Sequence, residues 1–427
     1  MEQENAWENH LKRLAHQALH DVQDRVMMVR EHGAERREQA PIVRLTNELL
    51  EHAIRTGASD LHIEPQKKEL RFRYRVDGVL RELHGAMPIK LHPLLVSRLK
   101  IMAGMDTSEH RKPLDGHIVY LLDGRKVDLR VASMPISHGE SIVLRIMNGS
   151  GQLRRMGELG MSEQNAKIFQ RMVHAPSGML ILTGPMNSGK TTSLYAALQE
   201  LNTAERNIVT LEDPVEQLVD GINQMEMNEK IGLDFAKGLR AMLRMDANCI
   251  MVGEARDTET AQIAVRAALT GHLLLTTLHA RDSCSALFRL LEMGIQPYLL
   301  AATLTGIVAQ RLVRCICPVC RESYEVQAGS EEAALLGRHY HPGLRLYRGR
   351  GCPECHGTGL RGRMAIHEIL EMKDVLRARL LRPKEPDALR RAAEEAGLVS
   401  MQQDGVQKVL QGLTTIGEVR RALYGGD

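Results

Sequence analysis

The sequence predicts a multidomain α/β protein whose largest domain is built on a doubly wound parallel sheet. The chain has 427 residues, 43% of them apolar, which suffices for roughly three domains with cores of their own. Beyond residue 155, short apolar runs without polar alternation take turns with helical stretches, a pattern typical of buried parallel strands. A glycine-rich G-x-x-x-x-G-K-[ST] segment follows the first of these runs. We therefore expect a ligand at the carboxyl ends of the strands.

The composition disfavours nucleic-acid binding. The net charge is only +3 and 3% of the residues are aromatic, so the chain offers neither a strongly basic character nor many rings for base stacking. The first residues, MEQENAWENH, lack the basic and apolar regions of a signal peptide. No run reaches the roughly 18 apolar residues of a membrane span. We expect a cytoplasmic protein that makes no direct nucleic-acid contacts and is held at a membrane by its partners.

Residues 1–40 are predicted to form an N-terminal amphipathic helix and a charged linker. Within residues 8–30, apolar side chains recur at helical spacing, namely Leu11, Leu14, Ala18, Val22 and Val26. This helix either packs on its own chain or docks on a partner protein.

Residues 41–150 are predicted to form an α+β domain. The helical stretch IVRLTNELLEHAIRTG is accompanied by three alternating segments, ELRFRYRVDG, GHIVYLLDG and KVDLRVASM, which predict strands. The arginines of these segments are expected on a solvated face.

Residues 155–310 are predicted to form the α/β core, with the runs GMLILTG, RNIVTLEDP, NCIMVGEA and HLLLTTLHA as buried parallel strands. Residues 311–365 hold two CxxC pairs among glycines and arginines, and residues 366–427 predict a helical C-terminal region.

The segment GPMNSGKTT has the context that a phosphate loop requires, because an apolar strand precedes it and a helical stretch follows. Backbone N–H groups would bind phosphate oxygens, Lys190 would neutralise the β and γ phosphates, and the Thr191 hydroxyl would reach Mg²⁺. Asn187 is compatible with this loop because asparagine tolerates positive φ. The predicted nucleotide-binding residues are Gly184, Pro185, Met186, Asn187, Ser188, Gly189, Lys190, Thr191 and Thr192.

Two acidic strand ends support a nucleotide site. Glu212 with Asp213, and separately Glu254, come just after buried strands, where a carboxylate is costly unless it faces a cation, water or a polar cleft. One can hold Mg²⁺ through its water shell while another orients the attacking water. Each could instead cap the next helix. His272 and His279 flank a further strand, with a catalytic or a structural role.

The two CxxC pairs predict a structural zinc site. Cys317, Cys320, Cys352 and Cys355 form two knuckles around a spacer of 31 residues, which is long enough for a folded insertion. Four thiolates close the coordination of zinc and leave no position for catalysis. Cys315 is expected to be a bystander. The alternative is four unrelated buried cysteines.

Blocks in this order resemble the ATPases that drive type II secretion and type IV pilus assembly. TGPMNSGKTT, NIVTLEDPVE, TGHLLLTTLHA and LTGIVAQRLVR match the core of that family, ASDLHIEP and RYRVDGVL match its preceding domain, and DGVQKVLQGLTTIGEVRRAL matches its C-terminus. The resemblance covers nearly everything after residue 41. It implies a RecA-like core that binds ATP with Mg²⁺, and a ring, expected to be a homohexamer, beneath an inner-membrane platform protein and a membrane-anchored recruiting protein.

The resemblance also assigns roles to residues. Glu254 is the Walker B acid, Glu212 the catalytic carboxylate, and His272 with His279 the histidine box. Arginines of the preceding domain reach nucleotide in the assembled ring of such enzymes, and the matching positions here are Arg130 and Arg145. Either arginine could instead pair with a local acid such as Asp128. A tetracysteine lobe is found in the assembly members of the family rather than in their retraction relatives.

Three positions depart from the family's pattern. A glycine of the loop is replaced by Asn187, the usual RQDPD segment is RMDAN at residues 244–248, and an expected arginine is His117. Two other hypotheses stay open. One is a conjugation or type IV secretion ATPase of the same class. The other, suggested by the RMDAN segment, is a nucleotide-dependent scaffold that does not hydrolyse ATP.

Overall fold

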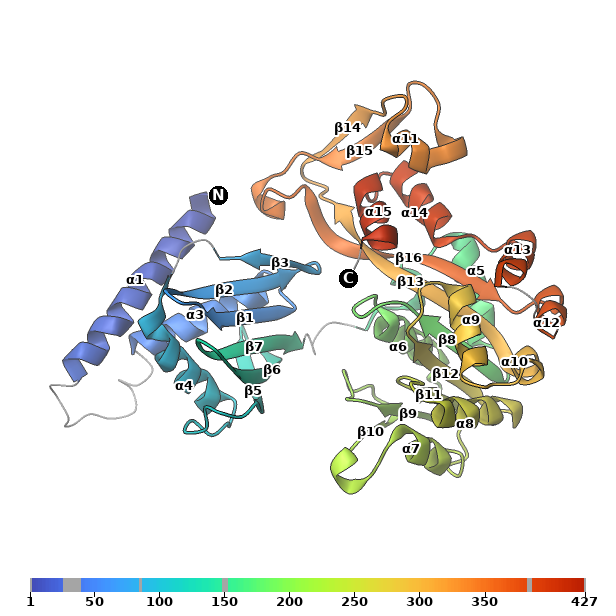
Figure 1. The fold of residues 1–427 in the computed structure, drawn as a ribbon, viewed down its shortest axis with the longest axis horizontal. Helices are drawn as coiled ribbons and strands as arrows, with labels where there is room; N and C mark the ends of the chain where they lie inside the picture. Colours follow the sequence, from blue (N-terminus) through green and yellow to red (C-terminus); the bar gives the residue numbers. More distant parts are fainter. Residues whose placement is uncertain (1, 26–39, 84–86, 148–152, 382–385, 426–427) are drawn as a thin grey trace. The chain divides into compact units, whose positions relative to one another are not determined.

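The computed structural model describes residues 2–25, 40–83, 87–147, 153–381 and 386–425. The chain divides into two compact units, Met1–Gly151 and Gln152–Asp427 (Figure 1). Within the described ranges, every helix is too short or too polar to cross a lipid bilayer.

An antiparallel sheet with helices on one face forms the first unit (Figure 1). Its strand order is β3-β2-β1-β7-β6-β5, and β4 pairs with β2. Alternate residues of the strands, such as Ile63, Phe72 and Leu144, are buried against the helices, whereas the arginine-bearing face is the other one. The strands are β1 (Asp60–Pro65), β2 (Glu69–Val76), β3 (Val79–Glu82), β4 (Met87–Pro88), β5 (Leu114–Leu122), β6 (Arg125–Ile136) and β7 (Gly139–Met147).

The helices of the first unit are α1 (Glu2–Arg25), α3 (Pro41–Arg55) and α4 (His92–Met102). Helix α1 packs on its own chain, because Leu11, Leu14 and Ala18 are buried in the core of this unit and the Trp7 ring stacks on His52 at a centroid distance of 3.6 Å. The structure therefore has the first of the two predicted arrangements. The side chain of Val22, and Val26 as a whole, lie outside the described residues.

The second unit contains a seven-stranded sheet with the order β10-β9-β11-β12-β8-β13-β16. Its strands pair in parallel except for β16, which runs antiparallel to β13. The four predicted apolar runs are the buried strands β8 (Gly178–Thr183), β9 (Ile208–Glu212), β11 (Cys249–Val252) and β12 (Leu273–Leu278). The remaining strands of this sheet are β10 (Asn223–Glu226), β13 (Leu304–Ile316) and β16 (Leu360–Glu371).

Helices cover both faces of this sheet, so the predicted doubly wound α/β fold is confirmed. One core joins Leu180, Leu182 and Met251 to α5 and α6, and the other joins Ile181 and Ile250 to α7 through α10. The helices are α5 (Glu163–Val173), α6 (Lys190–Leu201), α7 (Phe235–Met242), α8 (Thr258–Leu269), α9 (Ser283–Glu292) and α10 (Pro297–Thr303). Short 3-10 turns are η1 (Ile89–Leu91), η2 (Met156–Glu158), η3 (Glu229–Ile231), η4 (Gly337–His339) and η5 (Pro353–Cys355).

A small lobe connects the end of β13 to the start of β16. It contains the two-stranded sheet of β14 (Arg321–Glu325) and β15 (Arg345–Gly349) with α11 (Glu331–Leu336), which is a folded insertion between the cysteine pairs. After β16 come α12 (Asp374–Leu380), α13 (Pro386–Glu395), α14 (Met401–Leu410) and α15 (Ile416–Tyr424). Strands β13 and β16 run across the boundaries predicted at residues 310 and 365, and the domain limits stay a prediction.

Candidate nucleotide site and tetracysteine site

The phosphate-loop segment lies between the carboxyl end of β8 and the amino end of α6. Three residues of the turn have positive φ, with 150° at Gly184, 59° at Asn187 and 88° at Gly189. Asn187 therefore adopts the left-handed conformation that asparagine tolerates, as predicted. A Cβ on Gly184 would lie 2.4 Å from the backbone oxygen of Gln310, so only glycine fits there. Pro185, Met186, Ser188, Thr191 and Thr192 complete the predicted set on the same turn and the start of α6.

Helix α6 begins without a side-chain cap. Its N-cap residue, Gly189, makes no capping hydrogen bond, whereas Asp234, Asp257 and Asp282 cap α7, α8 and α9. The first N–H groups of a helix carry partial positive charge and need an acceptor. The amino end of α6 therefore fits a phosphate group.

The Lys190 ammonium lies over the loop. Its Nζ donates to the backbone oxygens of Gly184 and Pro185, each at 2.9 Å. Burial lowers the pKa of Lys190, and the nearby Glu254 and Glu216 oppose this change. The ammonium is thus held in a partly buried position where an anionic ligand would complete its pairing.

Glu254 forms a charged cluster beside Lys190. Its carboxylate pairs with Arg256 Nε at 2.6 Å and with His279 Nε2 at 3.1 Å. The hydrogen bond from Arg256 to Glu254 raises the pKa of Arg256. His279 follows the carboxyl end of β12, and Ala280 N donates to Thr183 Oγ1 at 2.9 Å, which ties this strand end to the entry of the phosphate loop. Two of the predicted residues, Glu254 and His279, are therefore brought together next to Lys190.

Glu212 is enclosed by hydrogen bonds. It is 3% exposed, and its carboxylate accepts from Tyr195 Oη at 2.5 Å, Thr210 Oγ1 at 2.6 Å and Gln224 Nε2 at 3.1 Å. Burial and the bond to Glu212 raise the pKa of Tyr195. Tyr195 lies on α6, so Glu212 connects β9 to the helix that follows the phosphate loop.

Glu216 is a site residue that the sequence prediction missed. Thr191 Oγ1, the predicted Mg²⁺ ligand, donates to Glu216 Oε1 at 3.3 Å. The last acid of the segment EDPVE thus lies closer to the start of α6 than its position after the strand suggested. The signal was present in the motif, which carries one glutamate directly before the aspartate-proline pair and another two residues after it.

His272 lies at the other end of β12. Its Nδ1 is 3.0 Å from the Ala267 backbone oxygen and 3.3 Å from Thr270 Oγ1. Because β12 is six residues long, His272 and His279 are separated by about 20 Å of strand. Within one chain His272 is at the amino edge of the sheet, away from the phosphate loop.

Arg130 and Arg145 belong to the first unit. Arg145 Nε pairs with Asp60 Oδ1 at 3.1 Å, and Asp128 pairs with His117 at 3.3 Å rather than with an arginine. Among the described residues Arg130 has no ion pair, and its side chain is exposed.

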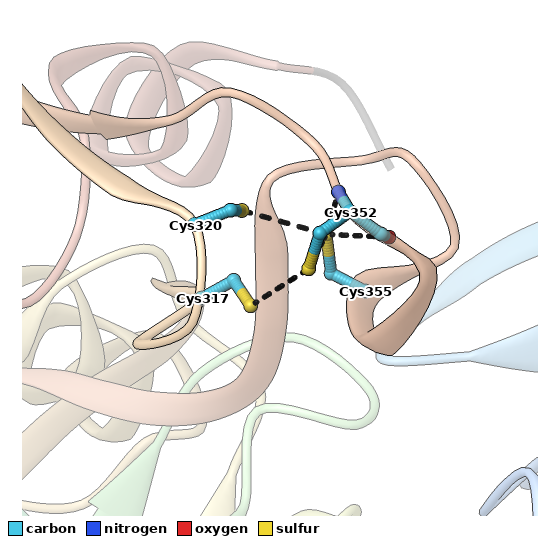
Figure 2. Close-up of side chains that lie close together, drawn as sticks. All are labelled: Cys317, Cys320, Cys352 and Cys355. Carbon is cyan, nitrogen blue, oxygen red and sulfur yellow. Dashed lines mark hydrogen bonds between the residues drawn. The ribbon is translucent and has the colours of Figure 1, made fainter.

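The four predicted zinc ligands come together, as Figure 2 shows. The Sγ atoms are 3.8 Å apart for Cys317 and Cys352, 3.8 Å for Cys320 and Cys355, and 3.7 Å for Cys352 and Cys355. A tetrahedron of thiolates at a zinc–sulfur distance of about 2.3 Å has edges of about 3.8 Å, whereas a disulfide bond is about 2.05 Å long. These distances fit a metal ion, and the alternative of unrelated cysteines is wrong. Cys315 is outside the cluster.

Backbone groups around the cluster favour a thiolate at Cys355, whereas burial raises the pKa of Cys320 to about 12. The N–H groups of Cys352 and Gly359 donate to Cys355 Sγ at 3.2 and 3.1 Å. Burial raises the pKa of Cys355, but these bonds outweigh it and lower the value to about 6. A Cβ on Gly359 would lie 2.3 Å from the Gly349 oxygen, so the two strands around the cluster can meet only at glycines.

Comparisons with known proteins identify the family. The profile of the family described as type II/IV secretion system protein matches residues 35–421. The chain belongs to this family. It is 47% identical over 387 residues to the type II secretion system ATPase E of Vibrio cholerae, covering 91% of this chain and 76% of the relative. The identity to type II secretion system protein E of Pseudomonas aeruginosa is also 47% over 387 residues, with the same coverage.

Solved structures agree on the fold. The Legionella pneumophila ATPase DotB superposes with a TM-score of 0.65 at 21% identity, covering 88% of this chain and 94% of DotB. The pilus retraction motor PilT with bound ADP gives 0.60 at 23% identity, covering 87% and 95%. The family profile and the curated relatives confirm the prediction that the chain is a member of the secretion and pilus ATPases, and the solved structures confirm the fold.

Proposed function

We propose that this protein hydrolyses ATP with Mg²⁺ and powers type II secretion or the assembly of type IV pili or pseudopili. One observation carries the proposal. The glycine-rich loop leads into α6, whose amino end has no side-chain cap and whose first residue, Lys190, places its ammonium against the loop. The membership in a family whose curated relatives carry type II secretion names supports the choice of system. The same names disfavour a conjugation or type IV secretion ATPase.

The loop residues from Gly184 to Thr192 bind the nucleotide in this proposal. The N–H groups at the start of α6 hold phosphate oxygens, and Lys190 exchanges its bonds to the Gly184 and Pro185 oxygens for bonds to phosphate. Thr191 and the neighbouring Glu216 would hold Mg²⁺, directly or through its water shell. The ion, when bound, neutralises developing charge on the phosphates.

Two carboxylates are proposed for catalysis. Glu254 is partly accessible next to Lys190 and can position water or the magnesium shell, while His279 orients it. Glu212, carried over from the family as the residue that polarises the attacking water, has to exchange the Tyr195 hydrogen bond for one to water. Closure of the site around bound nucleotide would be the event that changes the hydrogen-bond partners of Glu212. His272 also stays a proposal from the resemblance.

Cations for the transition state are proposed to come from Arg130 and Arg145 across a domain or subunit boundary. The core has to stabilise charge on three phosphates, and arginine is the residue best suited to do so. ATP binding would then pull the units together, and hydrolysis would release them. The working form would be a homohexamer in the cytoplasm, peripheral to the inner membrane and in contact with a platform protein and a membrane-anchored recruiting protein.

The tetracysteine lobe is proposed to hold one structural Zn²⁺ through Cys317, Cys320, Cys352 and Cys355. When bound, the ion joins the two knuckles that leave β13 and enter β16. All four ligands come from the protein, so the lobe takes no chemical part in hydrolysis.

Phosphate release by purified, concentrated protein tests the proposal. Steady release that needs both ATP and Mg²⁺ supports an ATPase. Tight nucleotide binding without release, under conditions where rings form, would instead support the scaffold hypothesis. Genes for pilin-like subunits and a polytopic platform next to this gene would distinguish the secretion and pilus systems.

A further inference from the structure

Gln310 lies in the middle of β13, and its side chain contacts the phosphate loop. Its side chain is 1% exposed. The amide Nε2 donates to the Ser188 backbone oxygen at 2.9 Å, and Oε1 accepts from Ser193 Oγ on α6 at 2.9 Å. One side chain therefore holds both the end of the loop and the first turn of the helix.

A phosphate loop creates the need for such a contact. Its N–H groups turn toward the ligand, so its carbonyl groups point into the protein, where each needs a donor. Lys190 supplies donors for the Gly184 and Pro185 oxygens, but phosphate competes for the same ammonium. The bond from Gln310 to Ser188 involves no group that a phosphate would engage, so it persists in both states.

Strand β13 also lies close to the two glycines of the phosphate loop, Gly184 and Gly189. A Cβ on Gly184 would meet the Gln310 backbone oxygen at 2.4 Å, and a Cβ on Gly189 would meet Gln310 Nε2 at 3.1 Å. On the other edge of β13, Gln310 pairs with His367 on β16. The backbone N–H of His367 in turn donates to the Asp404 carboxylate on α14. Gln310 thus joins the phosphate loop to a strand that is paired on both edges, with β8 and with β16.

We propose that Gln310 is a positioning residue of the nucleotide site, which fixes the curvature of the phosphate loop through Ser188 and Ser193. The inference rests on the proposed function, since it concerns the same site. A residue of this kind improves the binding of substrate and transition state alike. Its loss is therefore expected to raise KM and the nucleotide Kd while kcat changes little.

The test is the Gln310→Met variant of the full chain, which keeps the side-chain volume and removes both hydrogen-bonding atoms. We expect the Kd for a fluorescent ADP analogue with Mg²⁺ to rise roughly tenfold, the effect of leaving one buried acceptor without a partner. KM for ATP should rise in parallel, with kcat within about threefold of the native value. Gln310→Glu, which repels the Ser188 oxygen, should bind at least as weakly and provides a second variant if the first does not fold.

Thr305→Val is the matched control. Thr305 lies on the same strand, and its Oγ1 donates to the Met179 backbone oxygen on β8 at 3.0 Å, away from the phosphate loop. It should lower the unfolding temperature about as much as Gln310→Met and leave Kd unchanged. A Kd within twofold of native in a folded Gln310 variant would overturn the proposal, as would an equal loss of affinity in Thr305→Val. If native protein binds no nucleotide, the proposed function itself fails.

Discussion

Replacing Glu212 with glutamine should leave the fold intact and slow ATP hydrolysis by orders of magnitude. The carboxylate accepts three hydrogen bonds in a buried position. A glutamine can keep its oxygen toward Thr210 and Gln224 and donate its amide N–H to the Tyr195 hydroxyl oxygen. Each partner keeps one hydrogen bond, but the Tyr195 hydroxyl proton loses its acceptor, and the extra strength of bonds to a charged acceptor is also lost.

The cost to stability follows from this pairing. Each of the two remaining hydrogen bonds loses about 1 kcal/mol when its acceptor becomes neutral, and the stranded Tyr195 hydroxyl proton costs about 1–3 kcal/mol. The total of about 3–5 kcal/mol corresponds to a fall of about 6–20 °C in the unfolding temperature of a unit of this size. Glu212→Ala would instead strand three buried donors at about 1–3 kcal/mol each, so its inactivity would be uninformative. Glutamine is therefore the substitution that separates chemistry from folding.

The assay combines nucleotide affinity, phosphate release and thermal unfolding. Glu163→Gln is the control, because it makes the same chemical change at an exposed surface pair with Lys167. We expect native affinity in both variants and loss of turnover in Glu212→Gln alone. Turnover equal to native in Glu212→Gln would remove Glu212 from the catalytic role and leave it as the connection between β9 and α6.

The other predictions concern the lobe and the arginines. Purified protein should contain about one zinc per chain by elemental analysis, and Cys352→Ser should lose metal and destabilise the lobe far more than Cys315→Ser. Nucleotide binding should survive zinc loss, because the ligands lie outside the nucleotide site, and metal-free protein with native stability would contradict the zinc assignment. In mixing experiments at ring-forming concentrations, an inactive Arg130→Ala, Arg145→Ala protein should regain ATPase activity with Lys190→Ala protein, and absence of recovery in confirmed rings would count against a shared site.

The buried strands and the cysteine cluster were predictable because each depends on local pattern. Uninterrupted apolar runs identified β8, β9, β11 and β12, since a strand covered on both faces has no polar alternation. Two CxxC pairs predicted a shared metal site because zinc fixes the spacing within each knuckle. The loop conformation at Asn187 followed from the backbone preference of one residue type.

Contacts between segments that are distant in the sequence could not be predicted from the sequence pattern. Gln310 follows the phosphate loop by more than a hundred residues, and nothing in its own segment marks it as a partner of Ser188. The enclosure of Glu212 depends on Tyr195 facing it from α6, and the choice of Asp60 by Arg145 depends on the register of β1 and β7. Such pairings are set by tertiary packing rather than by periodicity.

The most direct test of a nucleotide site at the phosphate loop is ATP turnover by Lys190→Ala, compared with native protein and Lys167→Ala at equal ring-forming concentrations. Lys167 is a surface lysine paired with Glu163, so its removal costs little and controls for the loss of one positive charge. We expect Mg²⁺-dependent phosphate release by native protein and Lys167→Ala, and none above background by Lys190→Ala. Equal release by all three proteins would contradict a nucleotide site at this loop.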